Sequence, residues 1–188
     1  MMGRNIPNII SGLRILLVIP IVVVLSHKHY VEALLLFALA GASDGLDGYL
    51  AKHFDWKTRL GSILDPIADK LLLISVFLTL GWLGLVPAWL VIAVMARDGV
   101  ILGGAIAYHF LIGRYKMSPS FVSKTNTVFQ ILLVLAVVSF QVFPQFWTQW
   151  ILDFLIYIVL MTTVVSGSHY VWTWGRSAIR EYRKTQHV

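Results

Sequence analysis

The chain contains no cysteine, which excludes disulfide bonds and every metal site that is built from thiolates. Charged residues are also scarce, at 13% of the chain, whereas 58% of the residues are hydrophobic and the mean hydropathy is +0.79. Soluble domains carry roughly 25% charged residues. The composition therefore predicts an integral membrane protein, and residues 1–188 are expected to form a single membrane domain.

No low-complexity segment, linker or internal repeat is recognised, and six apolar stretches are long enough to span a membrane. They cover residues of about 8–26, 31–52, 61–84, 87–112, 120–143 and 147–175. We therefore predict an all-α protein with six transmembrane helices, which places both termini on one side.

The basic residues outside these stretches indicate which side that is. Only Lys28 falls on the side opposite the termini. The terminus side carries Arg4, Lys52, Lys57, Arg59, Arg114, Lys116, Lys124, Arg176, Arg180, Arg183 and Lys184. Because cytoplasmic loops are enriched in Lys and Arg, both termini are expected in the cytoplasm. The net charge of +6 comes from basic residues at the predicted membrane boundary, so we expect no nucleic-acid partner.

Four aspartates lie within two of the apolar stretches: Asp44, Asp47, Asp65 and Asp69. A carboxylate at the centre of a membrane helix costs roughly 2.5–3.5 kcal/mol on insertion scales. Spacings of three and four residues place each pair on one helix face. A short loop joins the two helices, so the pairs are expected to face each other in a polar cavity that opens to the cytosol.

Converging carboxylates repel one another unless a cation lies between them. A donor set of oxygen atoms, without His or Cys, favours Mg²⁺, Mn²⁺ or Ca²⁺ over zinc. Two ions per site are compatible with four carboxylates. The alternative is structural ion pairing of the acids with Lys70, Arg97 or Arg14.

Glycines surround the acids and allow two interpretations. Gly41, Gly45 and Gly48 would let helices approach closely, as small residues do in membranes. Gly48 and Gly61 would instead leave the backbone bare, so that a bulky ligand can lie against the metal site.

The acids and small residues form one pattern of eight fixed positions, Asp44-x2-Asp47-Gly48-x2-Ala51-Lys52-x8-Gly61-x3-Asp65-x3-Asp69. It closely resembles the signature of the CDP-alcohol phosphotransferase family, D-x2-D-G-x2-A-R-x8-G-x3-D-x3-D. The single departure is Lys52, which stands where the family usually has arginine. The six-span layout is similar to the family's core domain as well.

The resemblance implies a membrane enzyme, often a homodimer, that moves a phosphatidyl or related group from a CDP-linked donor to an alcohol and releases CMP. Asp44, Asp47 and Asp65 would be metal ligands. Asp69 would share the metal or act as the base that takes the proton of the acceptor hydroxyl. The implied cofactor is Mg²⁺ or Mn²⁺, with the site facing the cytoplasm.

The same resemblance implies that four residues line the cytidine nucleotide pocket, namely Gly48, Ala51, Lys52 and Gly61. Lys52 keeps the positive charge of the usual arginine but loses its bidentate geometry. This puts in doubt that one contact alone.

The acceptor alcohol is indicated by Ser123-Lys124-x-Asn126-Thr127, ahead of the fifth stretch. The string resembles the cardiolipin synthase branch of the family. Phosphatidylglycerophosphate synthases commonly carry a second lysine where Asn126 stands. One lysine fewer suits an acceptor with a single phosphate charge, so we predict phosphatidylglycerol as the acceptor and cardiolipin as the product. Glycerol 3-phosphate is the alternative acceptor.

Arg97 and Asp98 interrupt the fourth apolar stretch. They either satisfy each other inside the membrane, or Arg97 holds a substrate phosphate together with Lys124, Asn126 and, more weakly, Arg14. A distant alternative for the whole chain is a cation transporter that uses the acids as a relay. Because no targeting peptide is recognised, a bacterial inner membrane is the expected location, and an organellar membrane reached before removal of a targeting peptide is the alternative.

Overall fold

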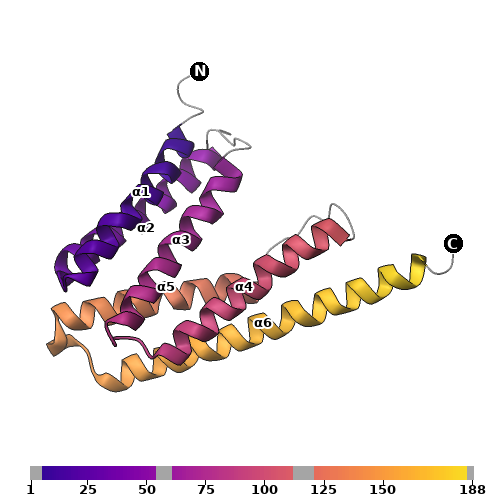
Figure 1. Cartoon of the computed structure of the whole chain (residues 1–188). Coiled ribbons are helices and arrows are strands. Elements are labelled where there is room, and N and C mark those ends of the chain that lie inside the picture. The colour runs from indigo at the N-terminus through magenta and orange to yellow at the C-terminus, as the bar shows by residue number, and fades with distance from the viewer. Residues whose placement is uncertain (1–5, 54–60, 112–120, 186–188) are drawn as a thin grey trace. The chain divides into compact units, whose positions relative to one another are not determined.

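The computed structural model describes the backbone over residues 6–53, 61–111 and 121–185, and the side chains over 10–43, 64–104 and 121–173. Over these residues the chain is all-helical (Figure 1). The helices are α1 (Ile6–Ser26), α2 (Tyr30–His53), α3 (Gly61–Trp82), α4 (Ala88–Leu111), α5 (Phe121–Val142), the short 3-10 helix η2 (Pro144–Phe146) and α6 (Gln149–Thr185). The prediction of an all-α chain with six long helices is confirmed.

The end of the last helix differs from the expectation. Hydropathy placed the end of the sixth stretch near residue 175, whereas α6 continues to Thr185. The reason is that hydropathy detects the segment that fits a membrane, while hydrogen bonding along the backbone continues beyond it. The apolar part of this helix spans 25 residues, Gln149–Thr173.

Within the part of the chain that is described, α5 and the segment Gln149–Thr173 of α6 are each long and apolar enough to cross a membrane. Ile10–Ser26 and Tyr30–Ser43 are apolar as well but shorter. These helices agree with a membrane protein. The number of spans and the side on which the termini lie stay predictions.

The chain forms two compact units, and α5 contributes to both of them. The first unit comprises residues 1–86 and 134–148, and the second comprises 87–133 and 149–188. Each unit is described by itself. The expectation of a single domain stays a prediction.

In the first unit, α1 packs against both α2 and α3 (Figure 1). Its buried apolar side chains come from all three helices: Ile21, Leu25, Ala33, Phe37, Phe77 and Leu80. In the second unit, α4 packs against α6, and Leu90, Val94, Leu152 and Val159 are among the buried side chains. Inside a membrane such contacts stabilise the fold by close packing, since lipid tails are as apolar as the helices.

Two helices of the first unit end in the same kind of turn, a Schellman motif. After α1, the Lys28 N–H binds the Leu25 carbonyl at 3.0 Å, and the His29 N–H binds the Val24 carbonyl at 2.9 Å. After α3, the N–H groups of Gly84 and Leu85 make the corresponding bonds, at 3.1 and 3.0 Å. The central residue of this turn has a positive φ, which is 72° at Gly84 and 62° at Lys28. Glycine is the usual residue there, so lysine is the unusual occupant.

Candidate active site

The structure places all four aspartates on helices of the first unit. Asp44 and Asp47 lie in the second half of α2, and Asp65 and Asp69 lie in the first three turns of α3. The spacing of four residues puts Asp65 and Asp69 on one face of α3, as predicted. The side chains of Asp44 and Asp47 lie outside the described residues, so the facing of the two pairs stays a prediction.

Two side chains of α1 bind the carboxylates of α3. The Ser11 hydroxyl donates a hydrogen bond to Asp65, and the Arg14 guanidinium forms an ion pair with Asp69, with 2.6 Å between Nη1 and Oδ1. Ser11 and Arg14 are buried, with 0% and 1% of their surface exposed, whereas the Asp69 side chain is 44% exposed. The carboxylate therefore reaches solvent while the arginine behind it does not.

The alternative that involved Arg14 in ion pairing is thus realised at one of the four acids. The Arg14 guanidinium binds Asp69 because α1 packs directly on α3, which brings the buried arginine to this carboxylate. The weaker expectation that Arg14 holds a substrate phosphate stays a prediction. An ion pair of this kind lowers the cost of holding a charge within an apolar bundle.

The donor atoms around α3 fit a hard divalent cation, because Asp65, Asp69 and Ser11 offer oxygen only. No group of three His, Cys, Asp or Glu side chains gathers among the described residues. Since Asp44 and Asp47 are outside that set, the four-carboxylate metal site stays a prediction.

Two glycines of α2 face open space in the described part of the chain. A Cβ atom added at Gly41 or at Gly45 would meet no heavy atom within 4 Å there. Within these residues the two glycines are not packing positions, and the interpretation of Gly48 as one stays a prediction. The backbone of α2 is open here, on the approach to Asp44. Of the expected nucleotide-binding residues, Gly48, Ala51 and Lys52 lie on α2 and Gly61 begins α3, but their surroundings are outside the described residues.

The second unit is organised around Arg97 of α4, which is 5% exposed. Its Nη2 donates hydrogen bonds of 2.6 Å to the hydroxyls of Ser123 on α5 and Ser166 on α6, and its Nε lies 3.2 Å from Ser166. Its Nη1 pairs with Asp98 at 2.6 Å. Gly167 makes room beside it, since a Cβ there would lie 3.6 Å from Cγ of Arg97. The satisfied intramembrane pair that we considered is therefore present.

Asn126 lies one helical turn beyond Ser123 and is fully buried. Its Oδ1 accepts hydrogen bonds from the hydroxyls of Thr162 and Thr163, at 2.8 and 3.0 Å. Its Nδ2 and the Nε2 of Gln130, one turn further along α5, are buried and have no hydrogen-bond partner among the described residues. Asn126 thus fixes α5 against α6, whereas Lys124 on the same helix is exposed.

Sequence reasoning missed several members of these clusters: Ser11, Gln130, Thr162, Thr163 and Ser166. A signal did exist. On α5, Ser123, Asn126 and Gln130 recur at spacings of three and four residues, which predicts one polar face on an apolar helix. Thr162 and Ser166 repeat the same spacing on α6.

The helical fold and its membrane-like segments define a class of integral membrane proteins, and a sequence comparison specifies the family. The model of the CDP-alcohol phosphatidyltransferase family matches residues 4–172. The chain belongs to this family.

The names of similar proteins state two different activities. A rice protein named CDP-diacylglycerol–glycerol-3-phosphate 3-phosphatidyltransferase 1, chloroplastic, is 34% identical over 183 residues, which cover 88% of this chain and 56% of the relative. Human cardiolipin synthase (CMP-forming) is 30% identical over 192 residues, covering 94% and 63%. Rat cardiolipin synthase (CMP-forming) is 33% identical over 155 residues, covering 74% and 51%.

The chain thus spans between about half and two thirds of the length of these relatives. The predicted enzyme class agrees with the family. The cation-transporter alternative loses its basis, because these relatives are named as transferases or synthases.

Proposed function

We propose that this protein transfers a phosphatidyl group from CDP-diacylglycerol to a glycerol-type alcohol and releases CMP, with phosphatidylglycerol as the acceptor and cardiolipin as the product. The observation that supports the reaction best is the pair of α3 carboxylates, held from α1 by Ser11 and Arg14, within a chain whose family is defined by this chemistry.

In the proposed reaction the hydroxyl oxygen of the acceptor attacks the phosphorus that carries the diacylglycerol. A new phosphorus–oxygen bond forms, the bond to CMP breaks, and CMP leaves with the electron pair. Asp69 accepts the proton of the attacking hydroxyl as general base. Its exposed side chain can reach a substrate hydroxyl while Arg14 stabilises its position from the buried side.

We propose that Asp44, Asp47, Asp65 and Asp69 hold Mg²⁺ or Mn²⁺, as one or two ions. The oxygen-only donors of the described part of the site fit these ions. Such a cation neutralises the pyrophosphate of the donor and stabilises the charge on the leaving CMP. Ser11 contributes by fixing the Asp65 carboxylate through its hydroxyl.

The nucleotide is proposed to lie along α2 and the start of α3, against Gly48, Ala51, Lys52 and Gly61. The open backbone at Gly41 and Gly45 supports a ligand beside this helix. We further propose a homodimer in a bacterial inner membrane, with the active site facing the cytoplasm.

For the acceptor, Arg97 and Lys124 are proposed to bind the phosphate of phosphatidylglycerol. Arg97 is fixed by the hydroxyls of Ser123 and Ser166 on two other helices and by the carboxylate of Asp98, so a substrate phosphate would share the guanidinium with these groups. Asn126 is proposed to act through α5, since its bonds to Thr162 and Thr163 set the position of the turn that carries Lys124.

Glycerol 3-phosphate is the second candidate acceptor. The name of the rice relative, which contains this acceptor, supports it. This acceptor carries nearly two negative charges at neutral pH. It would gain more from a second cation, which this chain does not place at Asn126.

An assay with separate acceptors decides between the two. The purified protein is given CDP-diacylglycerol with Mg²⁺ or Mn²⁺ and one acceptor at a time, and CMP and the lipid product are measured. CMP with phosphatidylglycerol, and cardiolipin as product, is the expected result. CMP only with glycerol 3-phosphate would overturn the acceptor but keep the reaction. No CMP with any alcohol would overturn the reaction itself.

A further inference from the structure

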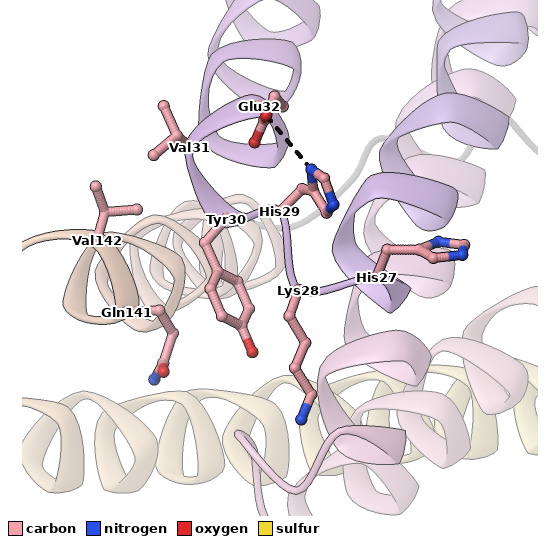
Figure 2. Close-up of a pocket in the computed structure, with 8 residues that line it drawn as sticks. All are labelled: His27, Lys28, His29, Tyr30, Val31, Glu32, Gln141 and Val142. Carbon is pink, nitrogen blue, oxygen red and sulfur yellow. Dashed lines mark hydrogen bonds and ion pairs between the residues drawn. The ribbon is translucent and has the colours of Figure 1, made fainter.

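A pocket of about 450 Å³ lies in the first unit at the turn between α1 and α2. It is lined by Lys28, Tyr30, Gln141 and their neighbours His27, His29, Val31, Glu32 and Val142 (Figure 2). Along α2, Asp44 lies fourteen residues after Tyr30, which is roughly 21 Å at 1.5 Å per residue. The pocket is therefore separate from the candidate active site.

The polar groups of this pocket are mostly donors. In Figure 2 the ammonium of Lys28 and the hydroxyl of Tyr30 extend from the turn toward the same side, and the amide of Gln141 on α5 points to that side as well. The carboxylate among the lining residues belongs to Glu32, which lies 3.4 Å from Nδ1 of His29. Among the described residues, the Lys28 ammonium makes no ion pair or hydrogen bond. A group of donors that includes an ammonium without a direct ion pair among the described residues favours an anion.

The backbone supports the same conclusion. Lys28 occupies the positive-φ position of the turn, which Gly84 occupies in the matching turn after α3. For a residue with a Cβ this conformation costs roughly 1–2 kcal/mol. The backbone of Lys28 is thus held in a conformation that glycine would adopt without that cost. Backbone strain of this kind is often found at residues that bind a ligand.

The position of the pocket indicates the source of the anion. It lies where the apolar segments Ile10–Ser26 and Tyr30–Ser43 meet, which is the level of the headgroups if these helices enter a bilayer. Val31 and Val142 line it, and exposed Val23 and Phe143 are nearby in the chain. An occupant with an anionic phosphate and an apolar body matches this surface better than a free ion does.

We propose that this pocket binds the phosphodiester headgroup of an anionic phospholipid, on the membrane face opposite the four aspartates. Lys28 pairs with the phosphate, Tyr30 and Gln141 donate hydrogen bonds to its oxygens, and the two valines contact the start of the acyl region. This site is independent of the proposed reaction.

The cysteine-free chain allows a local test. A single cysteine introduced as Val142→Cys carries an environment-sensitive fluorophore, and the full-length protein is placed in nanodiscs of phosphatidylcholine alone or with a minority of phosphatidylglycerol. The emission is expected to change with phosphatidylglycerol, to lose most of that change with Lys28→Gln, and to keep it with Lys28→Arg. A label at Gln149→Cys, on an exposed residue outside the pocket, reports the effect of surface charge alone.

Adding inorganic phosphate to the phosphatidylcholine nanodiscs distinguishes a lipid headgroup from free phosphate as the bound anion. The pocket label is expected not to respond. A response equal to that with phosphatidylglycerol would mean a free-phosphate site and overturn the lipid assignment. An equal change at Gln149→Cys, or an unchanged response in Lys28→Gln, would overturn the site. Because the readout needs no turnover, failure of the proposed reaction leaves it unaffected.

Discussion

The two units of the molecule each bury an arginine that pairs with an aspartate, but the two arginines have different surroundings. Arg14 of the first unit pairs with a carboxylate that lies 55 residues away in the sequence and is partly exposed. Arg97 of the second unit pairs with its sequence neighbour Asp98 and also binds hydroxyls. In the proposed function the carboxylates of the first cluster serve a cation and the guanidinium of the second serves an anion.

The largest effect is expected from the acid of the first cluster. Asp69→Asn removes the proposed base and one metal ligand, so CMP formation should fall on the order of 10²- to 10⁴-fold or more. The matched control is Asp153→Asn on α6, whose exposed carboxylate accepts a bond from Gln149 at 3.3 Å. Equal losses in both variants, measured as CMP released per minute, would contradict the role of Asp69.

The two arginines can be compared directly by thermal unfolding. Arg14→Leu leaves Asp69 without this ion pair, and we expect a loss of about 1–3 kcal/mol in the free energy of unfolding. Added Mn²⁺ should restore stability more strongly in this variant than in the unchanged protein, because arginine and metal compete for the same carboxylate oxygen.

Arg97→Leu provides the contrast. It should also destabilise, since Ser123 and Ser166 lose their buried partner, but Mn²⁺ should stabilise it no more than it stabilises the unchanged protein. If Mn²⁺ raised Tm by the same amount in both variants, the two clusters would not differ in the way proposed.

A smaller effect of opposite sign is expected from Gln130→Leu. Its buried Nε2 has no hydrogen-bond partner in the part of the chain that the structure describes, so an apolar side chain of similar size should raise the free energy of unfolding by about 1 kcal/mol. Gln141→Leu on the same helix, where the amide is only partly buried, should change Tm little. A loss of stability in Gln130→Leu would show that its amide has a partner.

The smallest effects come from the matched turns of the first unit. Lys28→Gly relieves the positive φ and should stabilise by about 0.5–1 kcal/mol, whereas Gly84→Ala should destabilise by about 1 kcal/mol. No heavy atom lies within 4 Å of a Cβ at Gly84, so the second change isolates the backbone. If Lys28→Gly lowered Tm as Gly84→Ala does, the backbone of Lys28 would not be under strain.

The helices and the candidate metal ligands could be predicted from the sequence, because a membrane constrains which residues are apolar and where charges lie. The first five helices begin and end within two residues of the predicted stretches. The aspartates were found because they are costly in an apolar helix. The partner of Asp69 was not singled out, because α1 is apolar on nearly all sides and its sequence does not indicate which face meets α3. The Ser166 hydroxyl beside Arg97 was missed because serine and threonine are common in membrane helices, and their spacing alone does not show which partner they bind.

The length of α6 has a mechanical consequence. At 1.5 Å per residue its 37 residues extend roughly 55 Å, whereas a bilayer's hydrocarbon core is about 30 Å thick. The helix is continuous from the apolar segment into the stretch that carries Arg176 and Arg180. Ser166, which binds Arg97, and Thr163, which binds Asn126, lie on this same helix. A change in the tilt of α6 at its basic end would therefore move the backbone that positions Arg97 and Asn126. We therefore expect the thickness and surface charge of the surrounding membrane to affect the geometry around Arg97 and Asn126.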